Sequence, residues 1–329
     1  HQRPQDGFHM KVLMQRFNIQ IGISGVFTGL LAIFILLSPR TFLSPQIYIS
    51  FASTIPFTAL LALGLTFLII AGEMDLSFPS VMAVSGLTFA ELFLATGNAG
   101  LAFIAAVAVG SAAGLMNGML VVRVGVPSII ATIGTQFFWR GFSTLMADGL
   151  ARNLVPVRDT LLHHLFVGRL TGTIPAQSLW CLGIAGVLGL ILNRHAFGES
   201  VLCIGDDIRT ARVMGIRTGR VRILLFVFMG AVSALVSVMT CLEMANWWPT
   251  QGEGYLLLVF ASIFIGGTSV FGGEGTVFGT LVGAAIIGII EAGIISAGFS
   301  GFWTRLVHGA IIVASVSVYA TIFRDRDTA

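Results

Sequence analysis

The feature that most restricts the fold of this chain is a series of apolar runs about 20 residues long. Runs of this length match a helix that crosses the hydrocarbon core of a bilayer, whereas a membrane-barrel strand needs only about 10 residues. Charged residues make up 10% of the chain and its mean hydropathy is +0.93, while a soluble domain carries about 25% charged residues. We therefore expect one all-α integral membrane domain.

About ten membrane crossings are expected, some of them broken or re-entrant. Glycine, proline and charged residues delimit the runs at 17–37, 47–71, 80–95, 101–122, 127–146, 178–192, 223–244, 255–265, 276–297 and 302–323. The run 255–265 is too short to span alone, so it is expected to be a broken helix buried in protein. Glycine-flanked breaks near 72–80 and 266–275 leave a distant similarity between the two halves open. The segment 246–249, which contains two tryptophans, predicts an interfacial helix end.

The charges predict the orientation of the chain in the membrane. With an even number of crossings, the tails 1–16 and 324–329 lie on the same side of the membrane domain 17–323. If that side is the cytoplasm, 12 of the 18 basic residues lie inside, which agrees with the excess of basic residues in cytoplasmic loops. The basic segment 148–175, assigned outside, is the exception, and a surface helix is expected within it. The first residues lack the apolar core of a signal peptide.

A polar surface segment, Leu202 to Arg222, lies between two apolar runs. Asp206 or Asp207 can cap a helix there, and Gly215 suits the left-handed position that ends one. Between them lie an apolar set and a basic set, namely Ile208, Ala211 and Met214, and Arg209 and Arg212. A helix of roughly two turns, about 12 Å long, would be marginal alone. The segment is therefore either an ordinary basic cytoplasmic loop or a docking helix for a soluble partner.

Carboxylates occur within or at the ends of the apolar runs, where a charge costs about 2.5–3.5 kcal/mol on insertion scales. They are Glu73, Asp75, Glu91, Glu243 and Glu291. Such groups are tolerated when they face a water-filled path or a partner. The alternative is structural: Asp75 would cap a broken helix ahead of Ser77, or a carboxylate would pair with a buried arginine such as Arg140 or Arg305.

Neutral polar side chains add further candidates for a translocation path. Besides Ser77 in the break, they are Asn117, Thr132, Thr135 and Gln136. They can line a polyol path, or they tie helices together at about 0.6 kcal/mol each. Phe138 lies in the aromatic run 137–139, which can stack on a sugar ring or simply pack.

The motifs of an enzyme, a metal site or a nucleotide site are missing. Lys11 is the one lysine, so the phosphate loop GxxxxGK[ST] cannot occur, and neither HExxH nor GxSxG is present. The three cysteines have no CxxC spacing, and His163-His164 has only Asp159 near ligand spacing. We expect no catalytic residue, metal or cofactor in this chain. The net charge of +3 reflects loop arginines rather than nucleic-acid binding.

Four glycine-rich or polar motifs follow one another along most of the chain. They are AGEMDLSFPS at 71–80, GLMNGMLVVRVGVPSIIATIGTQFFWRG at 114–141, GDDIRTARVMGI at 205–216 and GGTSVFGGEGTVFGTLVGA at 266–284. In this order they resemble segments of the permease subunit of bacterial ATP-binding-cassette importers of the ribose, xylose and galactose class. The resemblance implies a type II-like importer permease fold in the inner membrane. It also implies a path for a monosaccharide, sugar alcohol or related polyol.

The resemblance also implies partners and residue roles. The third motif corresponds to the cytoplasmic helix that docks into the ATPase, with the residues Gly205, Asp206, Asp207, Arg209, Ala211, Arg212, Met214 and Gly215. The expected partners are an ATPase subunit that binds ATP and Mg, a periplasmic sugar-binding protein and a second permease copy. Glu73 departs from the family pattern by replacing a glycine. It motivates the alternative of a proton- or cation-coupled secondary transporter that uses intramembrane carboxylates; a membrane enzyme is a third, weaker alternative.

Overall fold

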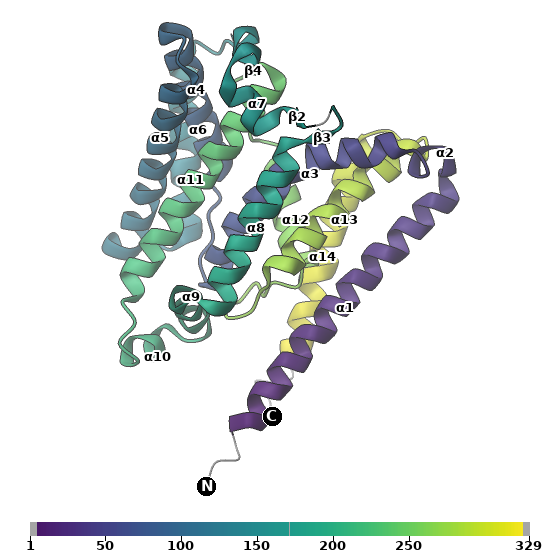
Figure 1. The fold of residues 1–329 in the computed structure, drawn as a ribbon. Helices are drawn as coiled ribbons and strands as arrows, with labels where there is room; N and C mark the ends of the chain where they lie inside the picture. The colour runs from purple at the N-terminus through teal and green to yellow at the C-terminus, as the bar shows by residue number, and fades with distance from the viewer. Residues whose placement is uncertain (1–4, 171, 325–329) are drawn as a thin grey trace.

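The computed structural model describes residues 5–170 and 172–324, and this part of the chain contains fourteen α-helices (Figure 1). Their bounds are α1 (Gln5–Leu37), α2 (Pro39–Phe42), α3 (Pro45–Ile70), α4 (Phe78–Thr96), α5 (Ala99–Met119), α6 (Ser128–Met146), α7 (Leu161–Val167), α8 (Ala176–Arg194), α9 (Ala196–Asp206), α10 (Ile208–Val213), α11 (Thr218–Met244), α12 (Tyr255–Ile265), α13 (Val277–Ser296) and α14 (Phe302–Arg324). A π-turn η1 (Leu120–Val124) continues α5, and a 3₁₀ turn η2 (Val155–Asp159) precedes α7.

Four two-residue strands form two small antiparallel ribbons. β1 (Arg152–Asn153) pairs with β4 (Asn246–Trp247), with Arg152 opposite Trp247. β2 (Arg169–Leu170) pairs with β3 (Ile174–Pro175), with Leu170 opposite Ile174. The expected surface helix in the segment 148–175 is confirmed as α7.

Seven of the described helices are long and apolar enough to cross a membrane: α1, α3, α4, α5 with η1, α8, α11 and α13. The expected all-α membrane fold is confirmed at this level. The other three expected crossings correspond to α6, α12 and α14, which are not among these seven helices. Helix α12 has 11 residues, and the apolar part of α14 is Phe302–Ala314. Helix α1 begins at Gln5, well before the apolar run at 17–37, because a helix extends beyond the part that is buried in hydrocarbon.

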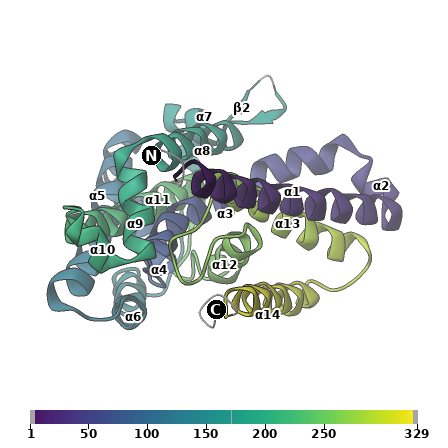
Figure 2. The ribbon, with the colours of Figure 1, turned by 90° about the horizontal axis from the view of Figure 1, so that it is seen from below.

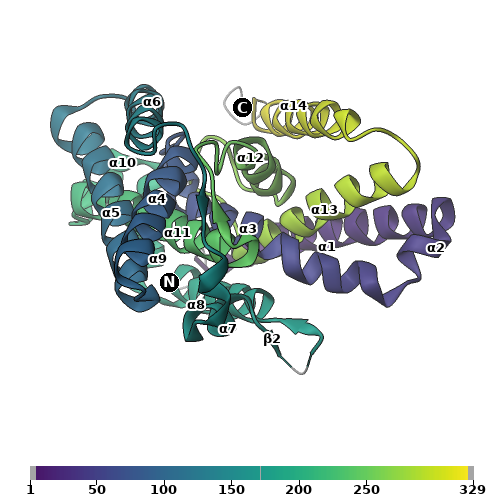
Figure 3. The ribbon, with the colours of Figure 1, turned by 90° about the horizontal axis from the view of Figure 1, so that it is seen from above.

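The two ends of the molecule are formed by different helices and loops. Helix α1 begins and α14 ends at the end where α10 lies, while α7 and the ribbons lie at the opposite end (Figure 1). We call these the α10 end and the α7 end. Viewed from above, α7 and β2 project at one edge of the α7 end (Figure 3). Both described chain ends therefore lie at the same end of the molecule as α10 (Figure 1).

The core is built on close contact between α5 and α11. A Cβ on Gly114 would lie 2.1 Å from the carbonyl oxygen of Phe226, and one on Gly230 would lie 2.1 Å from that of Gly110. Small residues at such positions allow the two backbones to touch. Membrane helices associate through such van der Waals packing, because there is no hydrophobic driving force between them in lipid. Helix α4 packs against both, so these three helices form one packed group beside α3 (Figure 1).

Two features of the fold correct the sequence-based expectations. The helix end expected next to 246–249 is present, because α11 ends at Met244, but Trp247 is not exposed to headgroups: it is completely buried, and its Nε1 donates to the carbonyl of Ala83 at 3.0 Å. Helix α9, which follows α8 and includes the first residues of the polar segment, was not expected. Its first turn is capped by the ring of His195, which accepts from the N–H of Phe197 at 3.0 Å.

Candidate functional site

The N-terminus of α10 forms as the sequence predicts, with Asp207 rather than Asp206 as the cap. Asp207 Oδ1 accepts hydrogen bonds from the backbone N–H groups of Arg209 at 2.6 Å and Thr210 at 2.7 Å. These bonds, that of Thr210 first, hold the pKa of Asp207 below its ordinary value. The carboxylate also places negative charge at the positive end of the helix. The cap thus fixes where α10 begins.

The C-terminus of α10 is closed by Gly215 in the left-handed conformation, with φ of +84°. The N–H groups of Gly215 and Ile216 bond to carbonyls of the last helical turn, which is the Schellman arrangement. Ala211 is completely buried, while Val213 and Met214 are 89% and 67% exposed. The short helix therefore holds on to the protein by one face and presents two apolar side chains outward at the tip of the α10 end.

Gly205, in the last turn of α9, connects α10 to the interior. A Cβ at this position would lie 1.6 Å from the carbonyl oxygen of Ile70, the last residue of α3. The same oxygen accepts a hydrogen bond from the N–H of Gly273 at 2.9 Å. The end of α9, the end of α3 and the loop 266–276 thus meet at one backbone oxygen. The three segments are therefore in direct backbone contact, with no side chain between them.

The segment Ala71–Ser77, between α3 and α4, is unwound, and Glu73 in it is paired with Arg222 of α11. Arg222 Nε donates to Glu73 Oε1 at 2.6 Å, and a second guanidinium nitrogen contacts the same oxygen. The sequence suggested Arg140 or Arg305 as partners for such carboxylates. For Glu73 that is wrong, because the first turn of α11 brings Arg222 beside the break.

Asp75, Ser77 and Asn117 form a buried chain of hydrogen bonds. Asp75 Oδ1 accepts from the N–H of Ser77 at 2.7 Å and from its hydroxyl at 2.6 Å. Asn117, on α5, donates from Nδ2 to Ser77 Oγ at 2.7 Å. The Asn117 Oδ1 atom is buried without a partner among the described residues. These side chains hold the start of α4 in place.

The backbone of the unwound segment is satisfied by side chains of α6. The N–H of Met74 donates to Ser128 Oγ at 3.2 Å, and the N–H of Leu76 donates to Thr132 Oγ1 at 3.1 Å. Irregular backbone at membrane depth is tolerated only where such groups find partners in protein. Five of the eight path candidates, Glu73, Asp75, Ser77, Asn117 and Thr132, therefore belong to the network that maintains this break.

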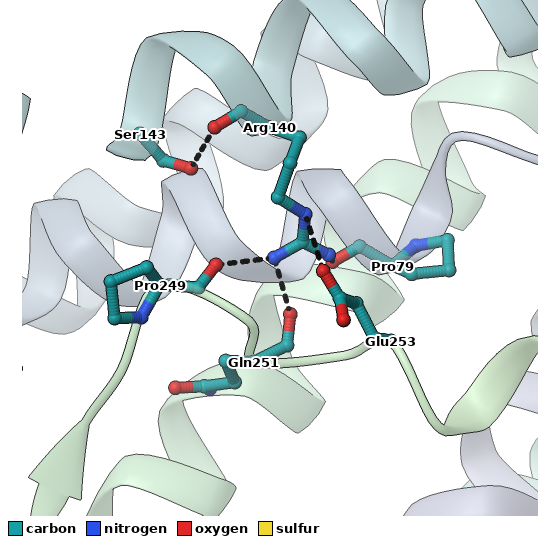
Figure 4. Close-up of polar contacts among 6 residues, drawn as sticks. All are labelled: Pro79, Arg140, Ser143, Pro249, Gln251 and Glu253. Carbon is teal, nitrogen blue, oxygen red and sulfur yellow. Dashed lines mark hydrogen bonds and ion pairs between the residues drawn. The ribbon is translucent and has the colours of Figure 1, made fainter. Parts of the chain in front are cut away.

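Arg140 ties α6 to α4 and to the loop before α12 (Figure 4). Its two terminal nitrogens donate to the carbonyls of Pro249 at 2.5 Å, Gln251 at 3.0 Å and Pro79 at 3.1 Å. Its Nε lies 3.7 Å from a carboxylate oxygen of Glu253. Arg140 lies about 18 Å along α6 from Ser128, at 1.5 Å per residue. The partly buried Arg140 guanidinium thus fastens α6 to the first turn of α4 and to the loop before α12.

The other three path candidates do not join this network. Thr135 is buried and donates to the carbonyl of Thr132 in its own helix, and Gln136 is half-buried. Phe138 is 56% exposed, with its ring centroid 4.9 Å from that of Trp139. The exposed aromatic face of α6 is open to lipid or to another chain.

A cavity of about 210 Å³ lies between α3, α12 and α13, and the sequence did not indicate it. Its polar lining comes from Thr54, Thr58, Tyr255 and Glu291. Only Glu291 was singled out from the sequence, because residues from three helices converge here through packing that no spacing reveals. Hydroxyls, an aromatic ring and a carboxylate are a suitable set of groups for a polyhydroxylated ligand.

The remaining intramembrane carboxylates have polar partners in the chain. Arg152 Nε donates to Glu91 Oε1 at 2.6 Å, and Gln177 Nε2 donates to Glu243 Oε2 at 3.3 Å.

His163 and His164 lie edge to face with ring centroids 5.5 Å apart, and burial lowers the pKa of His163. No group of three or more metal-binding side chains gathers within the described residues.

This geometry defines the class of the protein: a helical membrane domain whose surface helix is coupled to an unwound membrane segment, as expected of a transporter subunit. Residues 47–316 match the family described as "Branched-chain amino acid transport system / permease component". The chain belongs to this family, so it is a permease component and not an ATPase.

Similar curated proteins cover nearly the whole chain. The ribose import permease protein RbsC of Bacillus subtilis (strain 168) is 30% identical over 319 residues, 96% of each chain. The D-allose transport system permease protein AlsC of Escherichia coli (strain K12) is 31% identical over 294 residues, 88% of each chain. The L-arabinose transport system permease protein AraH of the same strain is 29% identical over 262 residues, 80% of this chain and 79% of that protein.

Proposed function

We propose that this chain is the permease subunit of an ATP-binding-cassette importer and forms the path for a monosaccharide, sugar alcohol or related polyol. The names of the relatives, which mention ribose, allose and arabinose, support a sugar as the substrate. The observation that carries the proposal is α10, a short capped helix whose exposed tip is joined to α3 through Gly205. A basic loop that served only to orient the chain in the membrane would not need such a contact.

The mechanism is gating rather than chemistry. A cytoplasmic ATPase binds ATP and Mg, and this chain needs no cofactor of its own. When the ATPase pair closes, it displaces α10. The motion reaches Ile70 through Gly205 and reaches Glu73 through Arg222, so that the α3 side of the α3–α4 break moves with α10. The path then opens between two permease chains.

The proposed topology places ten crossings in the bacterial inner membrane, with both termini and the α10 end in the cytoplasm. The inner-membrane location agrees with the name of a relative, the inner membrane ABC transporter permease protein YjfF of Escherichia coli (strain K12). In this topology the α7 end faces the periplasm, where a sugar-binding protein delivers the substrate. The exposed aromatic face of α6 then contacts lipid or the second copy of a homodimer.

Reconstitution in liposomes with the ATPase and binding protein tests this assignment. Deletion of residues 207–215, or Arg212→Glu, is expected to abolish ATP-driven sugar uptake, because the deletion removes the docking helix and the substitution reverses a charge on it. Membrane insertion and elution volume should not change. Normal uptake by the deletion variant would refute the proposal. A panel of pentoses, hexoses and sugar alcohols then identifies the substrate.

Secondary transport, the alternative, finds less support in the geometry. Glu73 and Glu91 are bound to arginines and Asp75 to Ser77, so these carboxylates are occupied within the chain. Of the carboxylates in the apolar runs, Glu243 has, within the described residues, only the neutral Gln177 as its hydrogen-bond partner, and Glu291, in the lining of the cavity, is the candidate that we test as a proton or cation site. The alternative predicts uptake by the chain alone under an imposed proton gradient, and loss of that uptake in Glu291→Gln.

A further inference from the structure

A second cavity lies at the α10 end, beside the junction rather than within it. It has a volume of about 380 Å³ and lies between the end of α5, the turn after α10 and the first turn of α11. Seen from below, α10 and the ends of these helices lie at one side of the molecule (Figure 2). Four arginines line it and no carboxylate does: Arg123, Arg212, Arg217 and Arg220. We call this cavity the arginine pocket.

The local backbone builds the pocket from two sides. The π-turn η1 ends α5 and carries Val122 and Arg123 toward the start of α11. Single π-turns of this kind are rare and frequently occur at functional sites. A Cβ on Gly219 would lie 3.1 Å from Val122 Cγ1, so the two helix ends are in near contact here. On the other side, Arg212 Nε donates to Thr218 Oγ1 at 3.3 Å, which holds the Arg212 guanidinium over the pocket.

The pocket has an unbalanced positive charge. The ion pairs found among the described residues are Arg140–Glu253, Arg152–Glu91 and Arg222–Glu73, and none involves an arginine of the pocket. Like charges gathered around a concave surface repel one another, and a bound anion removes that repulsion. All four arginines are exposed, so an anion can reach them from the surface. The arrangement therefore favours an anionic ligand.

The position of the pocket indicates where the anion comes from. It lies at the ends of two membrane spans, Ala99–Val124 and Thr218–Met244, which is the depth of lipid headgroups. Exposed apolar side chains stand beside it on both helices, including Met119 and Val124 on the α5 side and Leu224 on α11. A lipid with its headgroup in the pocket would cover these side chains with its acyl chains.

We propose that the arginine pocket binds the phosphate headgroup of an anionic phospholipid, such as phosphatidylglycerol or cardiolipin. A guanidinium donates two parallel hydrogen bonds to a phosphate, which the compact charge of a lysine cannot do. Basic pockets between membrane helices on the cytoplasmic side are suited to such headgroups. Because Arg212 and Thr218 flank the end of α10, a bound lipid would steady the turn that joins α10 to α11. This inference does not depend on the transported substrate.

Lipid retention by the full chain tests the proposal. The purified chain, in a mild zwitterionic detergent, is titrated with cardiolipin, and bound lipid is counted by native mass spectrometry. Arg217→Gln/Arg220→Gln is expected to bind about thirtyfold more weakly than the native chain, the ratio for about 1 kcal/mol from each of two arginines near a lipid surface. Arg217→Lys/Arg220→Lys keeps the charge and should show an intermediate loss. Arg158→Gln/Arg194→Gln removes the same charge elsewhere and should bind normally, and size-exclusion profiles report on folding.

Three outcomes would overturn the proposal. Equal cardiolipin binding by the native chain and Arg217→Gln/Arg220→Gln would show that the pocket is not a lipid site. Full displacement of cardiolipin by an equal concentration of inorganic phosphate would identify a site for a free anion. Unchanged cardiolipin binding with loss of the copurifying ATPase would show that the arginines contact acidic groups of that partner instead.

Discussion

Glu73 and Arg222, which are 149 positions apart in the sequence, form an ion pair that joins the α3–α4 break to the first turn of α11. Their side chains are 9% and 16% exposed, so water screens this pair little. A buried pair does not necessarily raise stability over an apolar pair, but removal of one partner leaves a charge without compensation. We infer that this pair specifies which segments are held together.

The first prediction is that Glu73→Gln and Arg222→Gln each destabilise the chain, by about 3–5 kcal/mol, because each leaves one buried charge unpaired. The double variant should lose much less than the sum of the two, since neither charge then remains. Thermal unfolding in detergent, with uptake assayed in parallel, measures both effects.

The pair Glu91–Arg152 provides a matched control for this prediction. Its geometry is similar, with Nε 2.6 Å from the carboxylate oxygen, but Glu91 is 50% exposed. Glu91→Gln should therefore cost about 0–1 kcal/mol, as exposed pairs do. Equal losses at Glu73 and Glu91 would mean that burial of the Glu73 pair has no energetic consequence.

The helix ends that depend on neighbouring residues could be predicted from the sequence. The start and end of α10 follow from Asp207 and Gly215, because a cap and a left-handed glycine act on neighbouring backbone groups. Most ends of the apolar runs lie within a few residues of helix ends for the same reason. Helix α9 was missed because His195 is an unusual cap, so no recognised start signal follows the run 178–192.

The partners of the buried polar groups were not predictable, because they depend on packing between distant segments. Nothing near Glu73 in the sequence points to Arg222, and nothing in 205–216 points to the carbonyl of Ile70. Trp247 was expected at the membrane interface, yet it fills a space between α4 and α11 that only the fold creates. A sequence pattern indicated which polar residues matter, but not which of them meet.

The second prediction concerns Gly205. Gly205→Ala should separate the end of α9 from α3, because a methyl group there would overlap the carbonyl of Ile70. Overpacking of this kind costs about 1–3 kcal/mol. We expect the ATPase to bind still, since the exposed tip of α10 is unchanged, while sugar uptake per ATP hydrolysed falls. Gly186→Ala in α8, where a Cβ meets nothing within 4 Å, is the control. Normal coupling in Gly205→Ala would exclude this contact as a route for the motion.

The third prediction concerns the pH dependence of the α10 cap. The pKa of Asp207 is lowered in the folded chain, so its ionised form stabilises α10 fully above the ordinary aspartate pKa. The contribution is lost as the pH falls through the lowered value. A nitroxide on Val213→Cys, with Cys203→Ser, should show rising mobility in acid. In Asp207→Asn, which keeps the acceptor oxygen but cannot titrate, this step should disappear. The same acid transition in both variants would place the titrating group elsewhere.

The fourth prediction tests the cavity between α3, α12 and α13. Thr58→Leu should fill part of its roughly 210 Å³ and remove a hydroxyl, so that sugar uptake falls about tenfold or more, the effect of losing a buried hydrogen bond of about 1.4 kcal/mol. Thr58→Ser keeps the hydroxyl and should retain most of the uptake. ATP hydrolysis without sugar should be equal in both variants, because Thr58 lies far along α3 from Ile70. If Thr58→Leu transports normally, the sugar does not pass through this cavity, and the path runs along another face of the chain.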